Sequence, residues 1–456
     1  MNEIVFGTDG WRATLSTFTE ERVRIVAQAA AEYFDERGAQ TVGIGYDARE
    51  TSPGFADALT EVLAGNGLDI VRSERDCPTP VLAWSVKNRE IDGGLVVTAS
   101  HNPPEYNGVK FLQPDGSPAG EEITDRLEEL LAGPDLLPEA EHGSVSEEPL
   151  VPAYIRHALD FVDTDLDGLS VAYDAMYGSG RNVTDALLSQ AGADVDRRRC
   201  ELDPTFGGGS PEPTEGKLGT LIEHVTEGGA DIGFANDGDA DRLAVVTPDR
   251  GFLDPNLLYA ALYEYLLESD SGSAVRTVST TFLIDKIAKA HGEETVEVPV
   301  GFKWVAQGMQ DANALCGGEE SGGFGITEHL RNKDGVLLAL VIAAAHSKQP
   351  IDDRVDAITD EHGDIYQDRI SVDCPDDRKE AVLSELDGSL PETVNDVTVE
   401  RVDTKDGFKI FLADGSWLLV RPSGTEPKLR VYAEANSAEQ VETVLAAGHD
   451  IVEPLV

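Results

Sequence analysis

The sequence predicts an α/β protein built from three similar domains with mixed, mostly parallel sheets, followed by a smaller α+β domain. At about 150 residues per domain, 456 residues give three to four domains. Short β-branched runs alternate with helical stretches, which is typical of βαβ units around a largely parallel sheet. Beyond His362 the pattern changes to strand-rich segments, and that change predicts a last domain of a different kind.

The clearest helix signal lies near the N-terminus, over residues 19–37. Thr19 is a good N-cap residue, acidic residues fill the first turn, and Gly38 follows as a terminator. Apolar residues recur at helical spacing between these ends, at Val23, Val26, Ala27, Ala30 and Phe34. We therefore expect an amphipathic helix in the first domain.

The strand signals resemble one another along the chain. Residues 41–46 lead into Asp47 and residues 169–173 lead into Asp174, while a third run at 276–279 opens a further unit. Similar modules in succession indicate a weak internal repeat of α/β units.

Composition suggests where the domains divide. Residues 133–149 are rich in Gly, Pro and Glu and predict a linker, and a second break lies near 251–255. At the C-terminal end, strand runs at 417–421 and 429–433 enclose a Gly/Pro loop, and a helix starts near Ser437. To within about ten residues, we expect domains at 1–150, 151–253, 254–362 and 363–456.

The charge balance limits what the protein can bind. Asp and Glu number 85 against 36 Lys and Arg, which gives a net charge of −49 and a pI near 4.3. Such a field repels nucleic acid and anionic membranes, so we expect neither as a partner. Only 12 of the basic residues are Lys. This composition predicts a halophilic protein, adapted to a salt-rich cytoplasm in which self-repulsion is screened.

Cysteine usage and hydrophobicity indicate the same compartment. The four cysteines lie far apart, with no CxxC pair, in a chain large enough not to need disulfides. The N-terminus lacks the apolar core of a signal peptide, and the longest apolar run, 336–345, is too short to cross a bilayer. We therefore expect a soluble cytoplasmic protein.

The first segment that carries chemistry is TASHNPPEYNGVK, residues 98–110, directly after the predicted strand 94–97. A strand that ends in a loop of Pro, Asn and Gly presents the Ser100 hydroxyl rigidly at the carboxyl edge of a sheet, where ligands bind in α/β folds. No G-x-S-x-G elbow surrounds this serine, so a hydrolase-type nucleophile is not expected. An ordinary polar turn is the alternative.

The second segment is NDGDADR, residues 236–242, between apolar runs at 232–235 and 243–247. It carries three alternating carboxylates, on Asp237, Asp239 and Asp241. They would repel one another without a cation, and they offer the hard oxygen ligands that Mg²⁺ prefers. An EF-hand is excluded because Arg242 stands where that loop needs Gly. The sequence therefore predicts a Mg²⁺ site rather than a patch of solvated charge.

Two later loops carry polar groups among glycines. In GGEESGG, residues 317–323, Glu319 and Ser321 could accept hydrogen bonds from the hydroxyls of a sugar, and Lys303 lies upstream beside a strand. In RPSGTEPKLR, residues 421–430, two arginines bracket a hydroxyl-rich stretch that can form an anion nest for phosphate. The alternatives are a flexible acidic turn and a plain hairpin connection.

Two shorter motifs, GTDGWR at 7–12 and GYDARETS at 45–52, each place an arginine after a turn. In company with TASHNP, DGDADR, GEESGG and RPSGTEP, in this order, they resemble the α-D-phosphohexomutase superfamily of phosphoglucomutases and phosphomannomutases. The resemblance covers almost the whole chain from Phe6. It implies four domains around a central cleft, which contribute in order a phosphoserine loop, a metal loop, a sugar loop and a phosphate loop.

The resemblance also implies roles for individual residues. Ser100 is expected to be phosphorylated and to join one Mg²⁺ ion held by three carboxylates, those of Asp237, Asp239 and Asp241. Three basic residues match positions around the reacting phosphate, with acid/base help expected from the first two: Arg12, Lys110 and Arg242. The expected substrate-binding residues are Thr8, His101, Lys303, Glu319, Ser321, Arg421, Ser423, Gly424, Thr425 and Arg430.

The activity implied is that of an isomerase acting by intramolecular phosphotransfer, which interconverts hexose 1-phosphate and hexose 6-phosphate. Glucose 1,6-bisphosphate is expected as intermediate and activator, small sugar phosphates as partners, and no obligatory protein partner. Glucose is favoured, with mannose close behind. Glucosamine is expected least, because Gly323 stands where some members have His, as in GEMSGH or GEQSGH. The same departure removes a histidine acid/base from that position.

Other classes are less favoured. A non-catalytic acidic cation-binding protein would not explain why three of the 12 lysines, Lys110, Lys303 and Lys428, lie in the candidate loops. A phosphatase would result if water reached the phosphoserine. We therefore also expect the C-terminal domain to close over the cleft by a hinge near His362.

Overall fold

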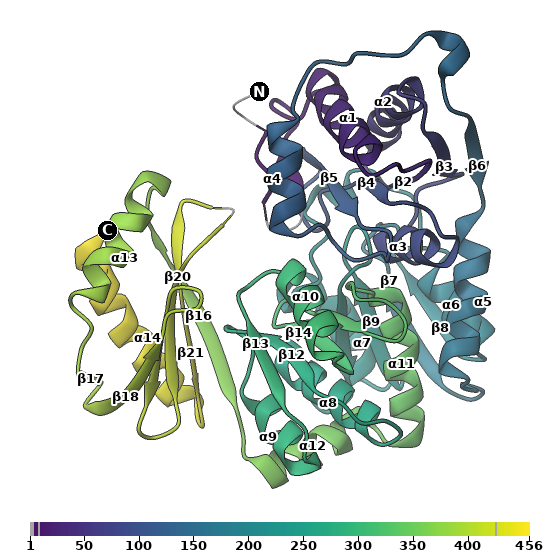
Figure 1. Ribbon diagram of the computed structural model, residues 1–456. Coiled ribbons are helices and arrows are strands. Elements are labelled where there is room, and N and C mark those ends of the chain that lie inside the picture. The colour runs from purple at the N-terminus through teal and green to yellow at the C-terminus, as the bar shows by residue number, and fades with distance from the viewer. Residues whose placement is uncertain (1–3, 8–9, 425) are drawn as a thin grey trace.

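The chain forms four β-sheets in succession (Figure 1). They are seen in a computed structural model that describes residues 4–7, 10–424 and 426–456. The first three sheets mix parallel and antiparallel strands and are flanked by helices, whereas the fourth is antiparallel throughout. The predicted fold class is therefore confirmed.

The first sheet has the strand order β1-β5-β4-β2-β3-β6. Its strands are β1 (Trp11–Thr14), β2 (Thr41–Tyr46), β3 (Asp69–Ser73), β4 (Gly94–Val97), β5 (Tyr106–Leu112) and β6 (Val145–Glu148). The helices are α1 (Glu20–Asp35), α2 (Ser52–Gly65), α3 (Thr79–Asn88), α4 (Glu121–Glu129) and the short 3₁₀ turn Glu139–Glu141. The predicted helix is confirmed in α1, where the Thr19 side chain accepts a hydrogen bond from the Arg22 N–H as N-cap.

β6 differs from the expectation of a plain linker over residues 133–149. It pairs in parallel with β3 at the edge of the first sheet. Its sequence, VSEE, is mostly exposed and so lacks the apolar alternation that marks a half-buried strand. The segment therefore extends the first sheet before the chain enters α5.

The second sheet has the order β11-β10-β9-β7-β8, with two parallel and two antiparallel pairings. Its strands are β7 (Ser170–Asp174), β8 (Asp194–Arg198), β9 (Ile232–Asn236), β10 (Leu243–Thr247) and β11 (Gly251–Phe252). The helices are α5 (Leu150–Val162), α6 (Thr184–Gln190) and α7 (Gly219–Thr226), with 3₁₀ turns at Phe206–Gly208 and Glu215–Lys217.

The third sheet has the order β13-β12-β14-β15, and its last pairing is antiparallel. Its strands are β12 (Ala274–Thr277), β13 (Thr295–Val298), β14 (Cys316–Glu319) and β15 (Gly323–Ile326). The helices are α8 (Pro255–Leu267), α9 (Leu283–His291), α10 (Phe302–Ala312), α11 (Gly335–Lys348) and α12 (Ile351–His362).

The fourth sheet has the order β16-β21-β20-β19-β18-β17. Its strands are β16 (Tyr366–Asp373), β17 (Thr393–Val394), β18 (Val397–Asp403), β19 (Phe408–Leu412), β20 (Trp417–Pro422) and β21 (Lys428–Ala435). The helices are α13 (Asp376–Asp387) and α14 (Ala438–Val452), and a 3₁₀ turn follows at Glu453–Leu455. β16 carries the chain from α12 into this sheet (Figure 1).

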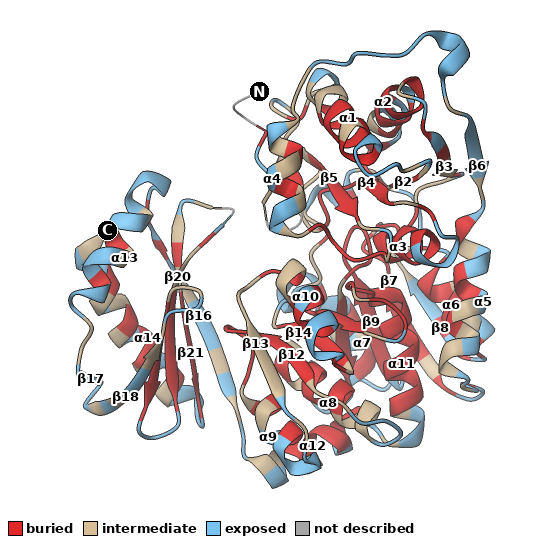
Figure 2. Ribbon diagram, in the orientation of Figure 1, coloured by how far each residue is buried: buried red, intermediate tan, exposed pale blue. Residues whose placement is uncertain are grey.

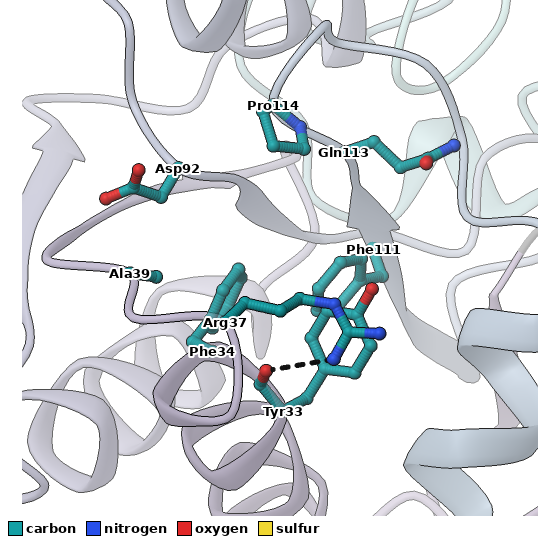
Figure 3. Close-up of a pocket in the computed structure, with 8 residues that line it drawn as sticks. All are labelled: Tyr33, Phe34, Arg37, Ala39, Asp92, Phe111, Gln113 and Pro114. Carbon is teal, nitrogen blue, oxygen red and sulfur yellow. Dashed lines mark hydrogen bonds between the residues drawn. The ribbon is translucent and has the colours of Figure 1, made fainter.

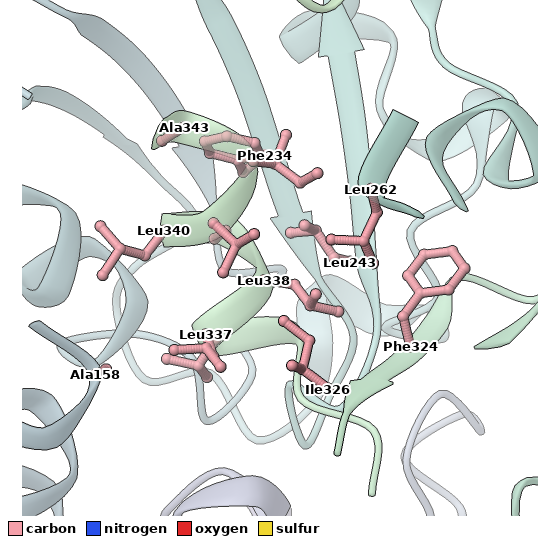
Figure 4. Close-up of a cluster of buried hydrophobic side chains, with 14 of the residues drawn as sticks. Ala158, Phe234, Leu243, Leu262, Phe324, Ile326, Leu337, Leu338, Leu340 and Ala343 are labelled. Carbon is pink, nitrogen blue, oxygen red and sulfur yellow. The ribbon is translucent and has the colours of Figure 1, made fainter. Parts of the chain in front are cut away.

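Helix α11 lies in a core that the second and third domains share. Residues 335–345 are all buried, as the continuous red ribbon of α11 in Figure 2 shows. Its leucines pack in one cluster with Phe234 and Leu243 of the second sheet and with Phe324 and Ile326 of the third (Figure 4). No helix in the described ranges has both the length and the apolar composition that a bilayer span requires.

A buried lysine joins the third and fourth domains. Lys409 on β19 is 1% exposed, and its ammonium donates a hydrogen bond to the Val278 carbonyl at 2.5 Å. The ammonium also lies 4.2 Å from the ring centroid of Phe282 and 4.3 Å from that of Trp417. Burial lowers the pKa of Lys409 to about 8. This interface therefore fixes β19 against the loop after β12.

Candidate active site

Ser100 lies in the loop between β4 and β5. Its hydroxyl is fully buried and donates a hydrogen bond to Asp237 Oδ2 at 2.7 Å, across 137 positions of sequence. The backbone φ of Ser100 is +51°, in the left-handed region that non-glycine residues rarely adopt. The structure therefore brings the predicted serine and the first predicted metal ligand into direct contact.

The three aspartates occupy the tight turn between β9 and β10. Asp237, Asp239 and Asp241 are buried, and one carboxylate oxygen from each lies within 4.8 Å of the others. The Oδ1 atoms of Asp239 and Asp241 are buried and accept no hydrogen bond from the described residues. Buried oxygens of this kind need a partner, and a divalent cation would supply one. The residues present therefore fit the predicted metal ion.

Two ammonium groups and a hydroxyl surround the triad. Lys110 on β5 places its Nζ 2.7 Å from Asp239 Oδ2 and 2.6 Å from Asp241 Oδ2. Lys333 Nζ lies 3.0 Å from Asp241 Oδ2, and the Thr79 hydroxyl donates to Asp239 Oδ2 at 2.6 Å. Thr79 and Lys333 were not among the predicted site residues. Thr79 is the first residue of α3, and Lys333 lies in the loop before α11. Both are distant in sequence from the aspartates, and no local motif marks either of them.

Burial and charge act in opposite directions on these groups. Burial raises the pKa of Asp237 well above its usual range, and the neighbouring carboxylates add to the rise. Burial also disfavours the ionised form of Asp239, but the Lys110 ammonium, the Thr79 hydroxyl and the charge of Lys333 together outweigh it and lower the pKa of that carboxyl. Asp237 and Asp239 therefore differ in how readily they ionise.

Further cationic groups face the same site. The backbone N–H of Arg242 donates to Asp237 Oδ1 at 3.1 Å. Arg12 lies on β1 opposite Gly108 of β5. The positive charge of Arg242, followed by burial and the charge of Arg12, strongly lowers the pKa of His101. The structure thus gathers these predicted residues at one edge of the first sheet, whereas Thr8 lies outside the described residues.

The predicted sugar loop begins at the end of β14 and reaches the same region. Glu319 is buried, and its Oε1 accepts a hydrogen bond from the Gly301 N–H at 2.9 Å. Burial, opposed by the charge of Lys333, raises the pKa of Glu319 to about 7. Ser321 is exposed. A Cβ atom at Gly323 would lie 2.5 Å from Lys333 Cδ, so Lys333 fills the space that a side chain at position 323 would need.

Lys303 is the second residue of α10 and connects two domains. Its Nζ lies 3.1 Å from Glu121 Oε1, at the first position of α4 in the first domain. The Lys303 side chain is 11% exposed and that of Glu121 is 56% exposed. Lys303, a predicted substrate-binding residue, is therefore paired with a carboxylate from the first domain.

The predicted phosphate loop forms a cluster of its own at the tip of the β20–β21 hairpin (Figure 1). Arg421 Nε donates to Asp406 Oδ2 at 3.0 Å, and the Arg430 guanidinium donates to the Glu426 carboxylate. Lys379, which was not among the predicted site residues, holds the loop by donating to the carbonyls of Ser423 and Glu426, each at 2.6 Å. These bonds do not bring the loop to Ser100. Gly424 is exposed, and Thr425 lies outside the described residues.

A cavity of about 270 Å³ lies at the other end of the first sheet (Figure 3). Phe111 and Gln113, which help to line it, sit at the end of β5 that pairs with the start of β4, whereas Ser100 follows the end of β4. Its remaining lining residues are Tyr33, Phe34, Arg37, Ala39, Asp92 and Pro114. This cavity is therefore separate from the serine and the aspartates.

Three α/β domains, an antiparallel C-terminal domain and a buried serine against three carboxylates define an isomerase of the phosphotransferase type, in the α-D-phosphohexomutase superfamily. The chain belongs to the phosphoglucomutase/phosphomannomutase family. Residues 3–136 match its alpha/beta/alpha domain I, 152–251 its domain II, 254–362 its domain III and 370–448 its C-terminal domain.

Relatives over the whole length carry different sugar names. The chain is 33% identical to a probable phosphoglucosamine mutase of Methanopyrus kandleri, covering 98% of this chain and 97% of that one. It is 32% identical to a phosphoglucomutase/phosphomannomutase of Thermococcus kodakarensis, covering 98% of each. The crystal structure of a putative phosphomannomutase from Thermus thermophilus superposes with a TM-score of 0.86, at 31% identity and 99% coverage of both chains. These similarities support the class and leave the hexose open.

Proposed function

We propose that the protein interconverts hexose 1-phosphate and hexose 6-phosphate, with glucose as the favoured hexose, through a phosphorylated Ser100 and hexose 1,6-bisphosphate. The proposal rests on one observation. The buried Ser100 hydroxyl lies 2.7 Å from the carboxylate of Asp237, in a triad that still offers two oxygens without partners among the described residues. Mannose is the second candidate, because glucose and mannose differ only at C2.

The chemical step is a phosphoryl exchange between two hydroxyl oxygens. The P–O bond to Ser100 Oγ breaks and a P–O bond to the free sugar hydroxyl forms, and the proton of that hydroxyl is transferred, in net terms, to the serine oxygen. Mg²⁺ held by the three aspartates would supply positive charge to the transferred group. Lys110, Arg12 and Arg242 would stabilise charge on the same group by position alone.

The second half of the reaction requires that the bisphosphate turn over and return its other phosphoryl group to Ser100. The phosphate loop would hold whichever phosphate is not reacting, and Glu319 and Ser321 would bind the sugar hydroxyls between the two ends. Arg430 is paired with Glu426. A bound phosphate would therefore compete with that carboxylate for the guanidinium.

The test is a Ser100→Ala variant assayed for conversion of glucose 1-phosphate to glucose 6-phosphate. We expect at least a thousandfold loss of kcat, with no loss in Ser146→Ala, which removes an exposed hydroxyl on β6. Intact mass after incubation with glucose 1,6-bisphosphate and Mg²⁺ should rise by one phosphoryl group in the wild type and not in Ser100→Ala. Robust turnover by Ser100→Ala would exclude the phosphoserine mechanism.

The favoured sugar is tested by kcat/KM values measured side by side for glucose, mannose and glucosamine 1-phosphates, in high KCl with Mg²⁺. We expect the highest value with glucose and a value within about tenfold with mannose. Activity should vanish with a chelator and return with Mg²⁺. A highest value with glucosamine 1-phosphate would overturn the choice of hexose and leave the mutase class intact.

A further inference from the structure

The motif GYDARETS contains a buried ion pair that the mechanism above does not use. Asp47 follows β2, Arg49 stands two residues later, and each is 1% exposed. Arg49 Nε donates to Asp47 Oδ2 at 2.9 Å. Buried ion pairs add little stability compared with apolar residues of the same size, so the pair calls for another explanation.

Arg49 uses all five of its N–H groups. One goes to Asp47, and the other four go to backbone carbonyls of the Ser100 loop. The Nη2 atom donates to the carbonyls of Ser100 at 2.8 Å and Asn102 at 2.7 Å. The Nη1 atom donates to those of Pro103 at 2.6 Å and Tyr106 at 3.1 Å. One guanidinium thus fixes the loop at four points.

Asp47 reaches the same loop from the other side of Ser100. Its Oδ2 accepts a hydrogen bond from the Thr98 hydroxyl at 2.7 Å, and the Thr98 oxygen in turn accepts one from the Ser100 N–H at 2.8 Å. The carbonyl of Ser100 is held by Arg49. The peptide groups on both sides of the serine are therefore fixed by the same ion pair.

The loop requires such support because its conformation is strained and its surroundings are tight. A left-handed φ at a residue with a Cβ costs about 1–2 kcal/mol. A Cβ atom on Gly238, beside the triad, would lie 2.5 Å from the Ser100 carbonyl oxygen, so the metal loop packs directly against this carbonyl. The Phe206 ring of the second domain lies 5.0 Å from the guanidinium carbon of Arg49. A small shift of the loop would move Ser100 Oγ away from Asp237.

We propose that Arg49, held by Asp47, is the positioning residue of the phosphoserine loop, and that it orients Ser100 Oγ for phosphoryl transfer. The inference rests on the proposed function, since it presumes that Ser100 carries the phosphate. All five N–H groups of Arg49 are engaged by protein oxygens, so it acts through the loop rather than on the substrate. Lysine would keep the charge but donates from a single atom, and it cannot hold four carbonyls spread around a plane.

The experiment compares Arg49→Lys with Arg354→Lys, which changes another buried arginine, paired with Glu268 far along the chain. For Arg49→Lys we expect kcat to fall at least tenfold, because misplacement of a reacting atom by about 1 Å is costly. KM for glucose 1-phosphate should stay within about twofold, because the proposed sugar loop at 317–323 and phosphate loop at 421–430 are untouched. Phosphorylation of Ser100 by glucose 1,6-bisphosphate, followed by intact mass, should slow by the same factor. Arg354→Lys should keep both rates.

The results for Arg49→Lys distinguish a positioning role from a purely structural one. Wild-type kcat and phosphorylation rate in folded Arg49→Lys would overturn the inference, as would a loss of Tm alone at constant kcat per folded molecule. If Arg49→Lys does not fold, Asp47→Asn, which preserves shape and removes the charge, carries the same expectation. A wild-type protein that takes up no phosphate overturns the proposed function and this inference together, whereas equal uptake by wild type and variant overturns this inference alone.

Discussion

Glu319 combines a buried carboxyl with a proposed role in sugar binding. Its pKa of about 7 places its ionisation within the range of a pH–activity profile. Because only the carboxylate accepts hydrogen bonds through both oxygens, we expect kcat/KM for glucose 1-phosphate to rise with pH through about 7. Glu319→Gln should lower kcat/KM at least tenfold and remove this ionisation from the profile. An unchanged profile in the variant would assign the ionisation to another group.

The same ionisation has a consequence for stability. Between its ordinary pKa of 4.5 and its raised pKa of about 7, the folded protein binds the Glu319 proton more tightly than the unfolded chain does. This group therefore makes the free energy of unfolding fall as pH rises across that range, and its contribution is constant above it. Urea unfolding at several pH values should show a shallower fall in Glu319→Gln.

The sequence identifies some site residues and necessarily misses others. Ser100 and the aspartate triad are each marked by a contiguous motif. Thr79 donates a hydrogen bond to Asp239 across 160 positions of sequence. No motif around either residue predicts that contact. RPSGTEPKLR displays both Arg430 and Glu426, but only the fold shows that they pair. Local motifs therefore reveal which groups carry chemistry, and tertiary structure decides which of them meet.

At the scale of elements, the start of α4 faces the start of α10 through the Glu121–Lys303 pair. If Lys303 binds the sugar phosphate, the Glu121 carboxylate competes with it. The Glu121 end of the pair is exposed, and ion pairs at the surface contribute about 0.2–1 kcal/mol, so Glu121→Gln should lower KM for the hexose monophosphate by up to about fivefold. The measurement is KM at low KCl, with Glu122→Gln as the matched control one position along the same helix turn.

The salt dependence of KM gives a second test of the Glu121–Lys303 ion pair. Screening weakens an exposed ion pair, so the KM difference between wild type and Glu121→Gln should shrink as KCl rises. A Glu121→Gln variant with wild-type KM at every salt concentration would show that the pair does not compete with substrate.

Helix α11 is the element on which the second and third domains both depend. Leu338 is 1% exposed within the shared core of Figure 4. Leu338→Ala should lower the free energy of unfolding by about 2–5 kcal/mol, measured by urea denaturation. Because one core serves two sheets, both domains should lose stability in a single transition. Separate transitions for the two domains would contradict a shared core.

The elements were predicted where their signals are local. The strands around Ser100 and the triad, and helix α1, follow from apolar runs, caps and turns. β6 could not be predicted, because an exposed edge strand such as VSEE has no apolar face to produce alternation. The apolar run in α11 was recognised as too short for a membrane, but uniform hydrophobicity does not say which neighbours cover it.

For the whole molecule, the net charge of −49 dominates the response to salt. Self-repulsion should destabilise the folded protein at low ionic strength, and screening should relieve it as the Debye length falls to about 3 Å near 1 M. We expect Tm to rise by several degrees between 0.1 and 1 M KCl, measured by scanning calorimetry, with the same rise in NaCl. A Tm independent of salt would contradict adaptation to a salt-rich cytoplasm.

The buried Lys409 at the interface between the third and fourth domains limits how these domains can move relative to each other. The ammonium packs against the rings of Phe282 and Trp417 and is held by the Val278 carbonyl and, at 3.1 Å, by Glu297 Oε2, so sliding β19 would separate a buried charge from its partners. We therefore expect any movement of the fourth domain to keep this contact and to be a rotation rather than a sliding displacement. If the β20–β21 loop holds the non-reacting phosphate as proposed, such a rotation would let the same loop accept the sugar phosphate in either of its two orientations.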